Sequence, residues 1–345
     1  MQSINPNIRL KPKKIYTAEE LLDGIKRCDR GLLSIAITYC ESRIKKYRDI
    51  ADQVLLGCIG LRREALKIGI TGTPGVGKST FIESLGKKIA EDKRNKVAVL
   101  AIDPSSQISH GSIMGDKTRM EKLSMLENVF IRPTSSGNYY GGVARSTYEA
   151  IIICEAAGFD YIFVETVGVG QSETDVKWLT DVFLLLLLPG GGDELQGIKR
   201  GIMEMADGIV FTKADMIPSG ILKRSISEIK TALHYLPPNV WNIPVFVQPV
   251  SSISGEGMEH LWDKIVEYYE KIKDHPLRNE AVRQKNLYWF DRLSKEWLIE
   301  RMFHFQQVKE VYEQQRIKVI DSTTHPVESI VQWKQWCDKI KIIRE

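Results

Sequence analysis

The sequence is poor in cysteine, and the cysteines it has are not spaced for a metal site. Its 345 residues hold an odd number of them, five, with no C-x-x-C pair: Cys28, Cys40, Cys58, Cys154 and Cys337. The six histidines are not clustered either. This pattern argues against a disulfide framework and a zinc site, and it favours a reduced, cytoplasmic setting.

A long hydrophobic run is also missing. The longest aliphatic stretch, VFLLLLL at 182–188, is far shorter than the roughly 20 apolar residues of a membrane span. Asp181 and Pro189 bound it, which predicts a buried central strand instead. The first residues, MQSINPNIRLKPKK, lack the apolar segment of a secretory signal. We therefore expect no membrane association.

Charge of one sign does not dominate the chain. The 48 Lys and Arg residues against 44 Asp and Glu residues give a net charge of +4. No global positive field therefore points to a nucleic-acid partner. The hydrophobic content of 43% can support a full-sized core in one large domain or two modest ones.

The stretch LKIGITGTPGVGKST at 66–80 carries the strongest functional signal. A short apolar strand runs into a G-x-x-x-x-G-K-[ST] turn and then a helix, which is the context of a phosphate-binding loop. Glycines let backbone N–H groups converge on a phosphate, and the helix dipole favours the same anion. The predicted nucleotide-binding residues of this loop are Gly72, Thr73, Pro74, Gly75, Val76, Gly77, Lys78, Ser79 and Thr80.

Short apolar strands alternate with helical stretches after this loop. Following the strand at Leu66, Ile68 and Ile70, we expect strands at Val97–Ile102, Val129–Ile131, Tyr161–Val164, Val182–Leu188, Gly208–Phe211 and Val245–Val250, and a helix at Ala144–Ala157. The alternation predicts an α/β fold, a mostly parallel P-loop NTPase sheet flanked by helices. Ligands then bind at the carboxyl ends of the strands.

Helical patterns flank this region on both sides. Thr17 and Glu20 form a capping-box pattern that begins a helical N-terminal region, 1–64. The nucleotide-binding domain is expected at 65–275 and a helical C-terminal arm at 276–345. From Asn279 the arm reads as one long helix, broken at Thr323–Pro326 and followed by a last helix. The apolar face of the long helix comprises Phe290, Leu293, Trp297, Leu298, Met302, Phe305, Val308 and Tyr312. That face could pack on its own domain or form a dimerisation arm.

A T-K-x-D element, Thr212-Lys213-Ala214-Asp215, ends one predicted strand and favours guanine. A buried Asp215 would accept two hydrogen bonds from guanine, whereas adenine offers neither donor there. The Lys213 stem can stack on the base. Thr212 replaces the usual Asn, and we expect that change to lose some local hydrogen bonding. Ser251, Ser252 and Ile253 follow the next strand as a possible base-backing loop.

Four oxygen-bearing residues are candidates for magnesium and catalysis. Glu165 begins Glu165-Thr166-Val167-Gly168, which has the D-x-x-G form with Glu for Asp. Its carboxylate can hold Mg²⁺, and the Gly168 N–H can contact a γ-phosphate. The predicted metal set is Ser79, Asp103, Asp116 and Glu165, and the predicted catalytic set is Lys78, Asp103, Asp116 and Glu165. The alternative for Glu165 is a carboxylate that caps a turn, and for Asp103 and Asp116 it is surface solvation or helix capping.

Two further observations bear on turnover. Val169 stands where a water-orienting Gln follows the D-x-x-G glycine in small GTPases, which predicts slow intrinsic hydrolysis that depends on a partner. The segment at 189–199, PGGGDELQGIK, is rich in glycine. It is either a third nucleotide-dependent switch or a flexible connection.

Together these motifs resemble one family. GTPGVGKST, AIDPSS, GSIMGDKTRM, ETVGVGQSE, LLLLLPGGGDELQGIKRG and TKAD, in this order, are similar to the methylmalonyl-CoA mutase-associated GTPases of the MeaB type, also known as ArgK transport kinases. The resemblance implies a homodimeric GTPase chaperone of an adenosylcobalamin-dependent acyl-CoA mutase. It implies GTP or GDP and Mg²⁺ as ligands, and a partner-coupled switch at 190–199.

The sequence departs from the family pattern at Thr212 and at Ser252, where Ala is common. Both departures bear on the strength of guanine selectivity. Two other functions stay open. One is a nucleotide-dependent kinase of the transport-associated type, and the other is a metal-delivery GTPase, for which the expected Cys or His cluster is missing.

Overall fold

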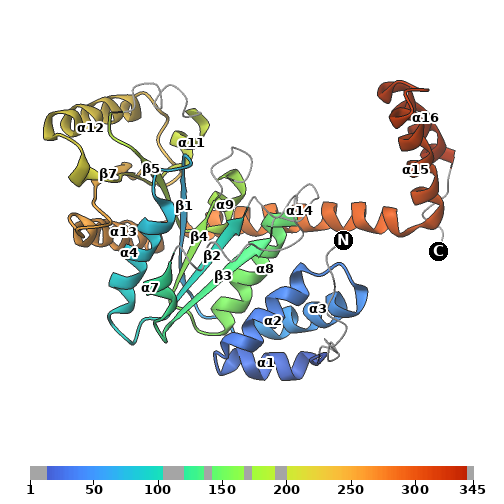
Figure 1. Cartoon of the computed structure of the whole chain (residues 1–345), viewed down its shortest axis with the longest axis horizontal. Coiled ribbons are helices and arrows are strands. Elements are labelled where there is room, and N and C mark those ends of the chain that lie inside the picture. The colour runs from blue at the N-terminus through green and yellow to red at the C-terminus, as the bar shows by residue number, and fades with distance from the viewer. Residues whose placement is uncertain (1–13, 104–119, 136–141, 167–172, 191–199, 340–345) are drawn as a thin grey trace, which may run out of the picture. The chain divides into compact units, whose positions relative to one another are not determined.

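Seven parallel strands form one sheet at the centre of the chain (Figure 1). The computed structural model describes residues 14–103, 120–135, 142–166, 173–190 and 200–339. The strand order is β3-β2-β4-β1-β5-β6-β7, and every pair is parallel. The strands are β1 Leu66–Gly72, β2 Val97–Asp103, β3 Val129–Ser135, β4 Tyr161–Glu165, β5 Val182–Leu187, β6 Gly208–Phe211 and β7 Phe246–Pro249. The predicted parallel sheet is confirmed.

Helices cover both faces of the sheet. They are α4 Lys78–Ala90, α7 Glu121–Ser124, α8 Gly142–Ala156, α9 Glu173–Leu179, α11 Arg200–Met205, α12 Ser219–His234 and α13 Met258–Lys273, with a 3₁₀ turn, η1, at Ala214–Met216. Alternation along β5 separates the two faces, since Leu184 and Leu186 pack with α4 and α13. Leu185 and Leu187 point the other way, toward α11 and α12.

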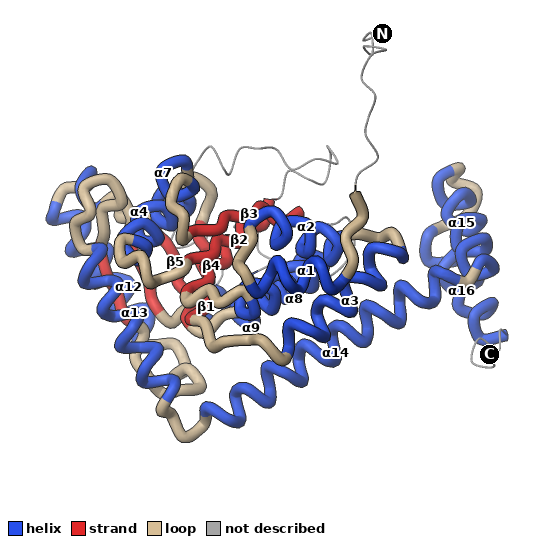
Figure 2. The backbone as a smooth tube through the Cα atoms, turned by 90° about the horizontal axis from the view of Figure 1, so that it is seen from below, coloured by secondary structure: helices blue, strands red, loops and turns tan. Residues whose placement is uncertain are grey.

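Three helices precede the sheet and pack on α8, beside which Figure 2 shows them. They are α1 Ala18–Lys26, α2 Arg30–Glu41 and α3 Lys45–Ile59. The predicted capping box starts α1, because the Glu20 N–H donates to Thr17 Oγ1 and the Thr17 N–H donates to Glu20 Oε2. Arg48 of α3 forms a bidentate pair with the buried Glu149 of α8. The N-terminal helices are thereby joined to the sheet layer.

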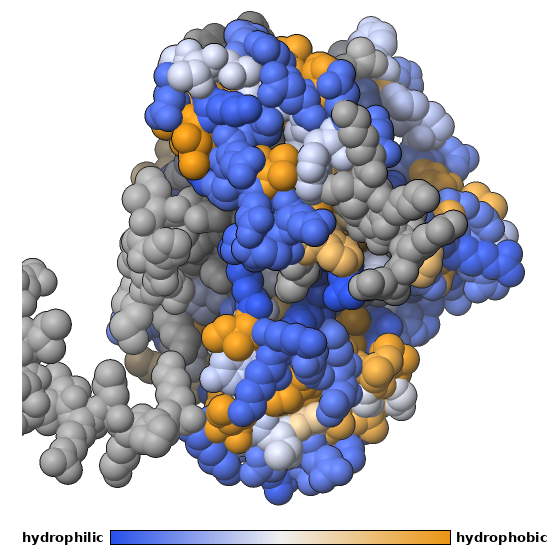
Figure 3. All heavy atoms as spheres, turned by 90° about the vertical axis from the view of Figure 1, so that its right-hand side faces the viewer, coloured by the Kyte–Doolittle hydropathy of each residue, from blue (hydrophilic) through white to orange (hydrophobic). Residues whose placement is uncertain are grey.

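The chain divides into two compact units, an N-terminal unit of residues 1–278 and a C-terminal unit of residues 279–345. The threefold division at 64 and 275 stays a prediction. The last helices are α14 Arg278–His304, α15 Gln306–Ile320 and α16 Pro326–Lys339. Hydrophobic residues also reach the surface in separate patches, as the face drawn in Figure 3 shows.

The prediction of one long helix through Tyr312 is wrong, whereas the break at 323–326 is confirmed. The helix is interrupted at Phe305, whose backbone is extended, with φ −72° and ψ 121°. The interruption lets aromatic rings of three helices meet: the Phe303 and Tyr312 ring centroids lie 5.0 Å apart, and those of Tyr312 and Trp333 lie 5.5 Å apart. This ring packing stabilises the bent arrangement.

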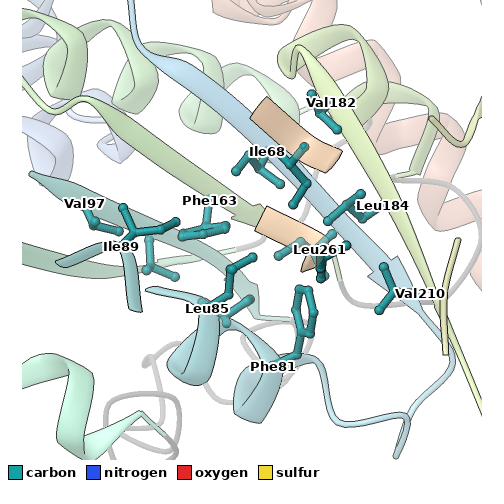
Figure 4. Close-up of a cluster of buried hydrophobic side chains, with 14 of the residues drawn as sticks. Ile68, Phe81, Leu85, Ile89, Val97, Phe163, Val182, Leu184, Val210 and Leu261 are labelled. Carbon is teal, nitrogen blue, oxygen red and sulfur yellow. The ribbon is translucent and has the colours of Figure 1, made fainter. Parts of the chain in front are cut away.

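The main core lies between the sheet and the helices α4, α7 and α13 (Figure 4). Ile68 and Leu184 of the sheet pack with Phe81 of α4 and Leu261 of α13, all fully buried. The five cysteines are free thiols, and burial raises the pKa of the Cys58 thiol to about 12. Among the residues that the structure describes, no helix is long and apolar enough to cross a membrane.

One edge of the sheet is the short strand β7. The N–H groups of Phe246 and Val250 donate to the backbone carbonyls of Asp207 and Phe211. The backbone polar groups of the alternate residues, Val247 and Pro249, therefore point to the open side of β7. Pro249 has no N–H, and the Val247 carbonyl accepts a hydrogen bond from Lys264 Nζ at 3.4 Å.

Candidate functional site

The predicted nucleotide-binding segments gather at the carboxyl edge of the sheet. The phosphate-binding loop leaves β1 at Gly72, which pairs with Leu186 of β5. On the other side of β1, Ile70 pairs with Glu165, the last residue of β4. The T-K-x-D element follows β6, and Ser251 follows β7. Parallel pairing therefore brings four separate sequence stretches to one edge.

The loop between β1 and α4 folds around its own lysine. Lys78 Nζ donates to the carbonyl oxygens of Gly72 at 2.8 Å and Thr73 at 3.3 Å. Gly77, with φ 95°, turns the chain into α4 in a conformation that favours glycine. A Cβ on Gly72 would lie 2.6 Å from the Leu186 carbonyl oxygen, so only glycine fits there. The helix N-terminus and the ammonium are the two positive groups that a phosphate-binding loop offers to an anion.

Two predicted metal ligands from different elements meet beside this loop. Ser79 Oγ donates to Glu165 Oε1 at 3.2 Å, and Glu165 is only 8% exposed. A hydroxyl and a carboxylate are hard oxygen donors of the kind that Mg²⁺ prefers. The chemistry of this pair therefore fits a magnesium ion.

A buried threonine pair fixes the exit of β4 against β1, and sequence reasoning missed it. Thr166 Oγ1 donates to Thr71 Oγ1 at 2.9 Å, and the Thr166 N–H donates to the Ile70 carbonyl at 2.9 Å. These bonds hold the end of β4 in register with the start of the phosphate-binding loop. No motif contains both threonines, and only the order of the strands makes them neighbours.

The T-K-x-D element is bonded to the phosphate-binding loop by two side chains, which we call the Thr212–Lys213 clamp. Thr212 Oγ1 donates to the Val76 carbonyl at 2.7 Å, and Lys213 Nζ donates to the Gly75 carbonyl at 3.0 Å. Thr212 is buried. Thr212 therefore reaches a loop carbonyl with its hydroxyl, and the expected loss of some local hydrogen bonding relative to asparagine stays a prediction.

The two base-binding segments are held together by the end of β7. The Ala214 N–H donates to the Val250 carbonyl at 3.1 Å, and the buried Ser251 accepts the Ser254 N–H on its Oγ at 3.1 Å. Asp215 is exposed on η1, so the expectation of a buried carboxylate is wrong for the chain itself. Ser252 is half-buried, and Ile253 is 80% exposed.

The remaining predicted site residues are only partly described. Asp103 ends β2, opposite Ser135 and two residues beyond the Ala101–Glu165 pair, so its backbone lies at the same edge. Asp116, Gly168 and Val169 lie outside the described residues. So does the glycine-rich segment from 191 to 199. Its first glycine, Gly190, is described, and the N–H of that residue donates to Ser225 Oγ at 3.0 Å.

Comparison with known proteins places the chain in one family. The sequence pattern described as "Methylmalonyl Co-A mutase-associated GTPase MeaB" matches residues 33–307. The chain is 48% identical over 263 residues to a putative GTPase of Caulobacter vibrioides, covering 76% of this chain and 79% of that protein. It is 39% identical over 333 residues to the mitochondrial methylmalonic aciduria type A homolog of Mus musculus, covering 92% of this chain and 79% of that protein.

A solved structure agrees in fold. The crystal structure of an LAO/AO transport system kinase superposes with a TM-score of 0.68 at 28% identity, covering 95% of this chain and all of that one. GTPase ArgK of Escherichia coli is 36% identical, covering 90% of this chain and 93% of that protein. The predicted resemblance is confirmed: the chain belongs to the methylmalonyl-CoA mutase-associated GTPases of the MeaB type, GTP-hydrolysing P-loop enzymes that bind guanine nucleotides.

Proposed function

We propose that this GTPase is a chaperone of an adenosylcobalamin-dependent acyl-CoA mutase, such as methylmalonyl-CoA mutase. It would gate the loading of the mutase's cofactor and protect the mutase from inactivation. The family assignment supports the partner. The observation that carries the nucleotide half of the proposal is the site itself, in which the Ser79–Glu165 pair and the Thr212–Lys213 clamp flank one phosphate-binding loop.

The side chains then have distinct roles toward GTP. Lys78 would exchange its loop carbonyls for the outer phosphate oxygens, because a charged acceptor is the stronger partner. Ser79 and Glu165 would hold Mg²⁺, with Asp103 and Asp116 completing its surroundings. When bound, the ion stabilises charge on the phosphoryl oxygens. Asp215, on the solvent side of η1, would accept the two donors of the guanine edge.

Hydrolysis by the chain alone is expected to be slow. Val169 has no polar group with which to orient the attacking water. A partner that supplies or positions such a group would raise the rate, as activating proteins do for other GTPases. GTP turnover would thereby report on the state of the mutase.

The test compares GTP turnover of the full chain alone with turnover in the presence of the acyl-CoA mutases of the same organism, in apo and holo form. We expect at least one mutase to stimulate turnover about tenfold or more, with apo and holo forms differing. The Lys78→Ala variant serves as the inactive control. If no mutase changes turnover and none co-purifies with the chain, the chaperone role is refuted.

We also propose that the chain forms a homodimer through α14. One side of this helix exposes four large apolar residues: Leu287, Phe290, Trp297 and Leu298. A second copy would bury such a stripe. Phe290→Asp combined with Trp297→Glu should yield monomers in analytical ultracentrifugation, whereas Lys295→Glu, on another side of α14, should not. A wild-type chain that sediments as a monomer would refute this proposal.

The similarity to a transport system kinase favours one alternative, a nucleotide-dependent kinase. A kinase would transfer the γ-phosphoryl group to a protein or small-molecule hydroxyl. With γ-labelled GTP we expect the label in inorganic phosphate only. The metal-delivery alternative lacks support, because no group of three His, Cys, Asp or Glu residues suited to a metal occurs within the described residues.

A further inference from the structure

A buried carboxylate, Asp207, lies at the amino edge of the sheet, far along the strands from the nucleotide site. It is 1% exposed and precedes β6 directly. Its Oδ2 accepts the Phe183 N–H at 2.8 Å and the Lys177 ammonium at 2.5 Å, and its Oδ1 accepts the Tyr268 hydroxyl at 2.7 Å. A buried charge needs such partners. One of them, Lys177, also links Asp207 to another helix.

Lys177 belongs to α9, whose chain continues from Glu165 and Gly168. Asp207 follows α11, the helix that begins directly after the glycine-rich segment 191–199. In the sequence, α9 follows the predicted γ-phosphate-sensing element and α11 follows the glycine-rich segment. The Lys177–Asp207 pair therefore links α9 to the residue that follows α11. The two helices also pack against each other.

Both helices have a second attachment to the same face of the sheet. Val176 and Leu179 of α9 are buried, and α9 packs on β1 and β5. Met203 of α11 packs with Leu185 and Ile209 of β5 and β6. Van der Waals contacts of this kind resist separation but tolerate sliding, whereas a charged pair fixes one atom of α9 to one atom of the segment ending α11.

We propose that Lys177 and Asp207 are a positioning pair that makes α9 and α11 respond together to the nucleotide. A change at the γ-phosphate that displaces α9 is then transmitted to α11, which begins where the glycine-rich segment ends. This inference rests on the proposed function, since it requires the site to distinguish GTP from GDP.

Lys177 is the informative position because its replacement leaves Asp207 with two donors, Phe183 N–H and Tyr268 Oη. Lys177→Met removes the ammonium and keeps an unbranched aliphatic side chain. Tyr268→Phe is the matched control: it takes a different donor from the same carboxylate and leaves the tie to α9 intact. Lys177→Arg retains the positive charge that pairs with Asp207.

The experiment is amide hydrogen exchange of the full chain, measured by mass spectrometry with Mg²⁺ and either GDP or a non-hydrolysable GTP analogue. In wild type we expect the analogue to slow exchange in both α9 and α11, by about threefold or more. In Lys177→Met, α9 should still respond while α11 no longer does. Tyr268→Phe and Lys177→Arg should keep both responses.

Two results would overturn the inference. One is an α11 that responds to the analogue equally well in Lys177→Met. The other is a wild-type α11 that does not distinguish the two nucleotides. The exchange experiment contains no mutase. The chain can therefore give the expected exchange pattern even if no mutase stimulates its GTP turnover. Hydrogen exchange therefore tests the Lys177–Asp207 inference, and mutase-stimulated turnover separately tests the chaperone role.

Discussion

The carboxyl and amino edges of the sheet, where the parallel strands end and begin, hold their charged side chains in different ways. At the carboxyl edge, Lys78 and Lys213 donate to backbone carbonyls of the phosphate-binding loop. At the amino edge, Lys67 lies between two carboxylates, 3.0 Å from Glu155 and 3.0 Å from Asp181. The first arrangement leaves the cations able to change partner, and the second does not.

This difference assigns the lysines at the carboxyl edge to nucleotide binding and the lysine at the amino edge to stability. A neutral carbonyl is a modest partner for an ammonium, so a phosphate can replace it at little cost. A buried ion pair has no such freedom, since removing either member leaves an uncompensated charge in a poorly solvated place. Substitutions at the two edges should therefore affect different measurements.

The largest effect is expected at the amino edge. Lys67→Met should lower the free energy of unfolding by about 3–5 kcal/mol, because the buried carboxylate of Asp181 loses this cation and that of Glu155 is left with Arg62. Urea unfolding measures this loss. GTP affinity under native conditions should stay near the wild-type value. Lys271→Met, which breaks an exposed pair with Glu267, should leave the unfolding midpoint unchanged. Equal shifts in the two variants would contradict the comparison.

The reverse pattern is expected at the carboxyl edge. Lys78→Ala should weaken GTP binding about 100-fold, or ~2.7 kcal/mol, by removing the charge that meets the outer phosphates. Its unfolding midpoint should change little, because the half-buried Lys78 donates to neutral carbonyls rather than to a buried carboxylate. Titration calorimetry gives the affinity, with Lys87→Ala on the exposed side of α4 as the control. A Lys78 variant that binds GTP normally would remove the basis of the site assignment.

A smaller effect is expected at the Thr212–Lys213 clamp. Thr212→Val keeps the shape of the side chain but leaves the Val76 carbonyl without its donor, so GTP affinity should fall about tenfold. Thr212→Asn supplies an amide donor and should recover affinity. Calorimetry with GTP, GDP and ATP distinguishes a general loss of binding from a loss of guanine preference. An unchanged Thr212→Val would mean that the clamp does not position the loop.

The smallest effect is the dependence of stability on alkaline pH. Burial alone lowers the pKa of Lys67, but the carboxylates of Asp181 and Glu155 outweigh burial and hold that pKa above its ordinary value of 10.5. A raised folded-state pKa means that the stabilisation is fully present below pH 10.5 and is lost as pH rises through the folded-state value. The difference between the urea midpoints of wild type and Lys67→Met should therefore begin to narrow only above pH 10.5. Convergence at neutral pH would contradict the ion pair.

The sequence predicted the sheet well because strands and turns are encoded locally. The strand at Gly208–Phe211 was predicted to the residue, and the phosphate-binding loop follows from its glycine spacing. The break at Phe305 could not be predicted, because no proline or glycine marks it and the Trp333 ring that packs near it, on Phe303, is distant in the sequence. Helix periodicity continues through that point in the sequence although the structure turns there.

The site divides in the same way. Motif spacing identified Lys78 and Ser79, whose neighbours are close in the chain. The hydrogen bond between Thr212 and Val76 joins residues 136 positions apart, and the Thr71–Thr166 pair spans 95. Such contacts depend on which strands lie next to each other, and a single sequence does not state the strand order.

The edge strand β7 has a consequence for the chain at high concentration. Its open side offers a further strand no N–H at Pro249, and the Val247 carbonyl is already bonded to Lys264. A foreign strand would have to give up two of the bonds that a sheet extension normally forms, and would meet a positive charge as well. Two copies of this protein are thereby discouraged from joining their sheets through β7.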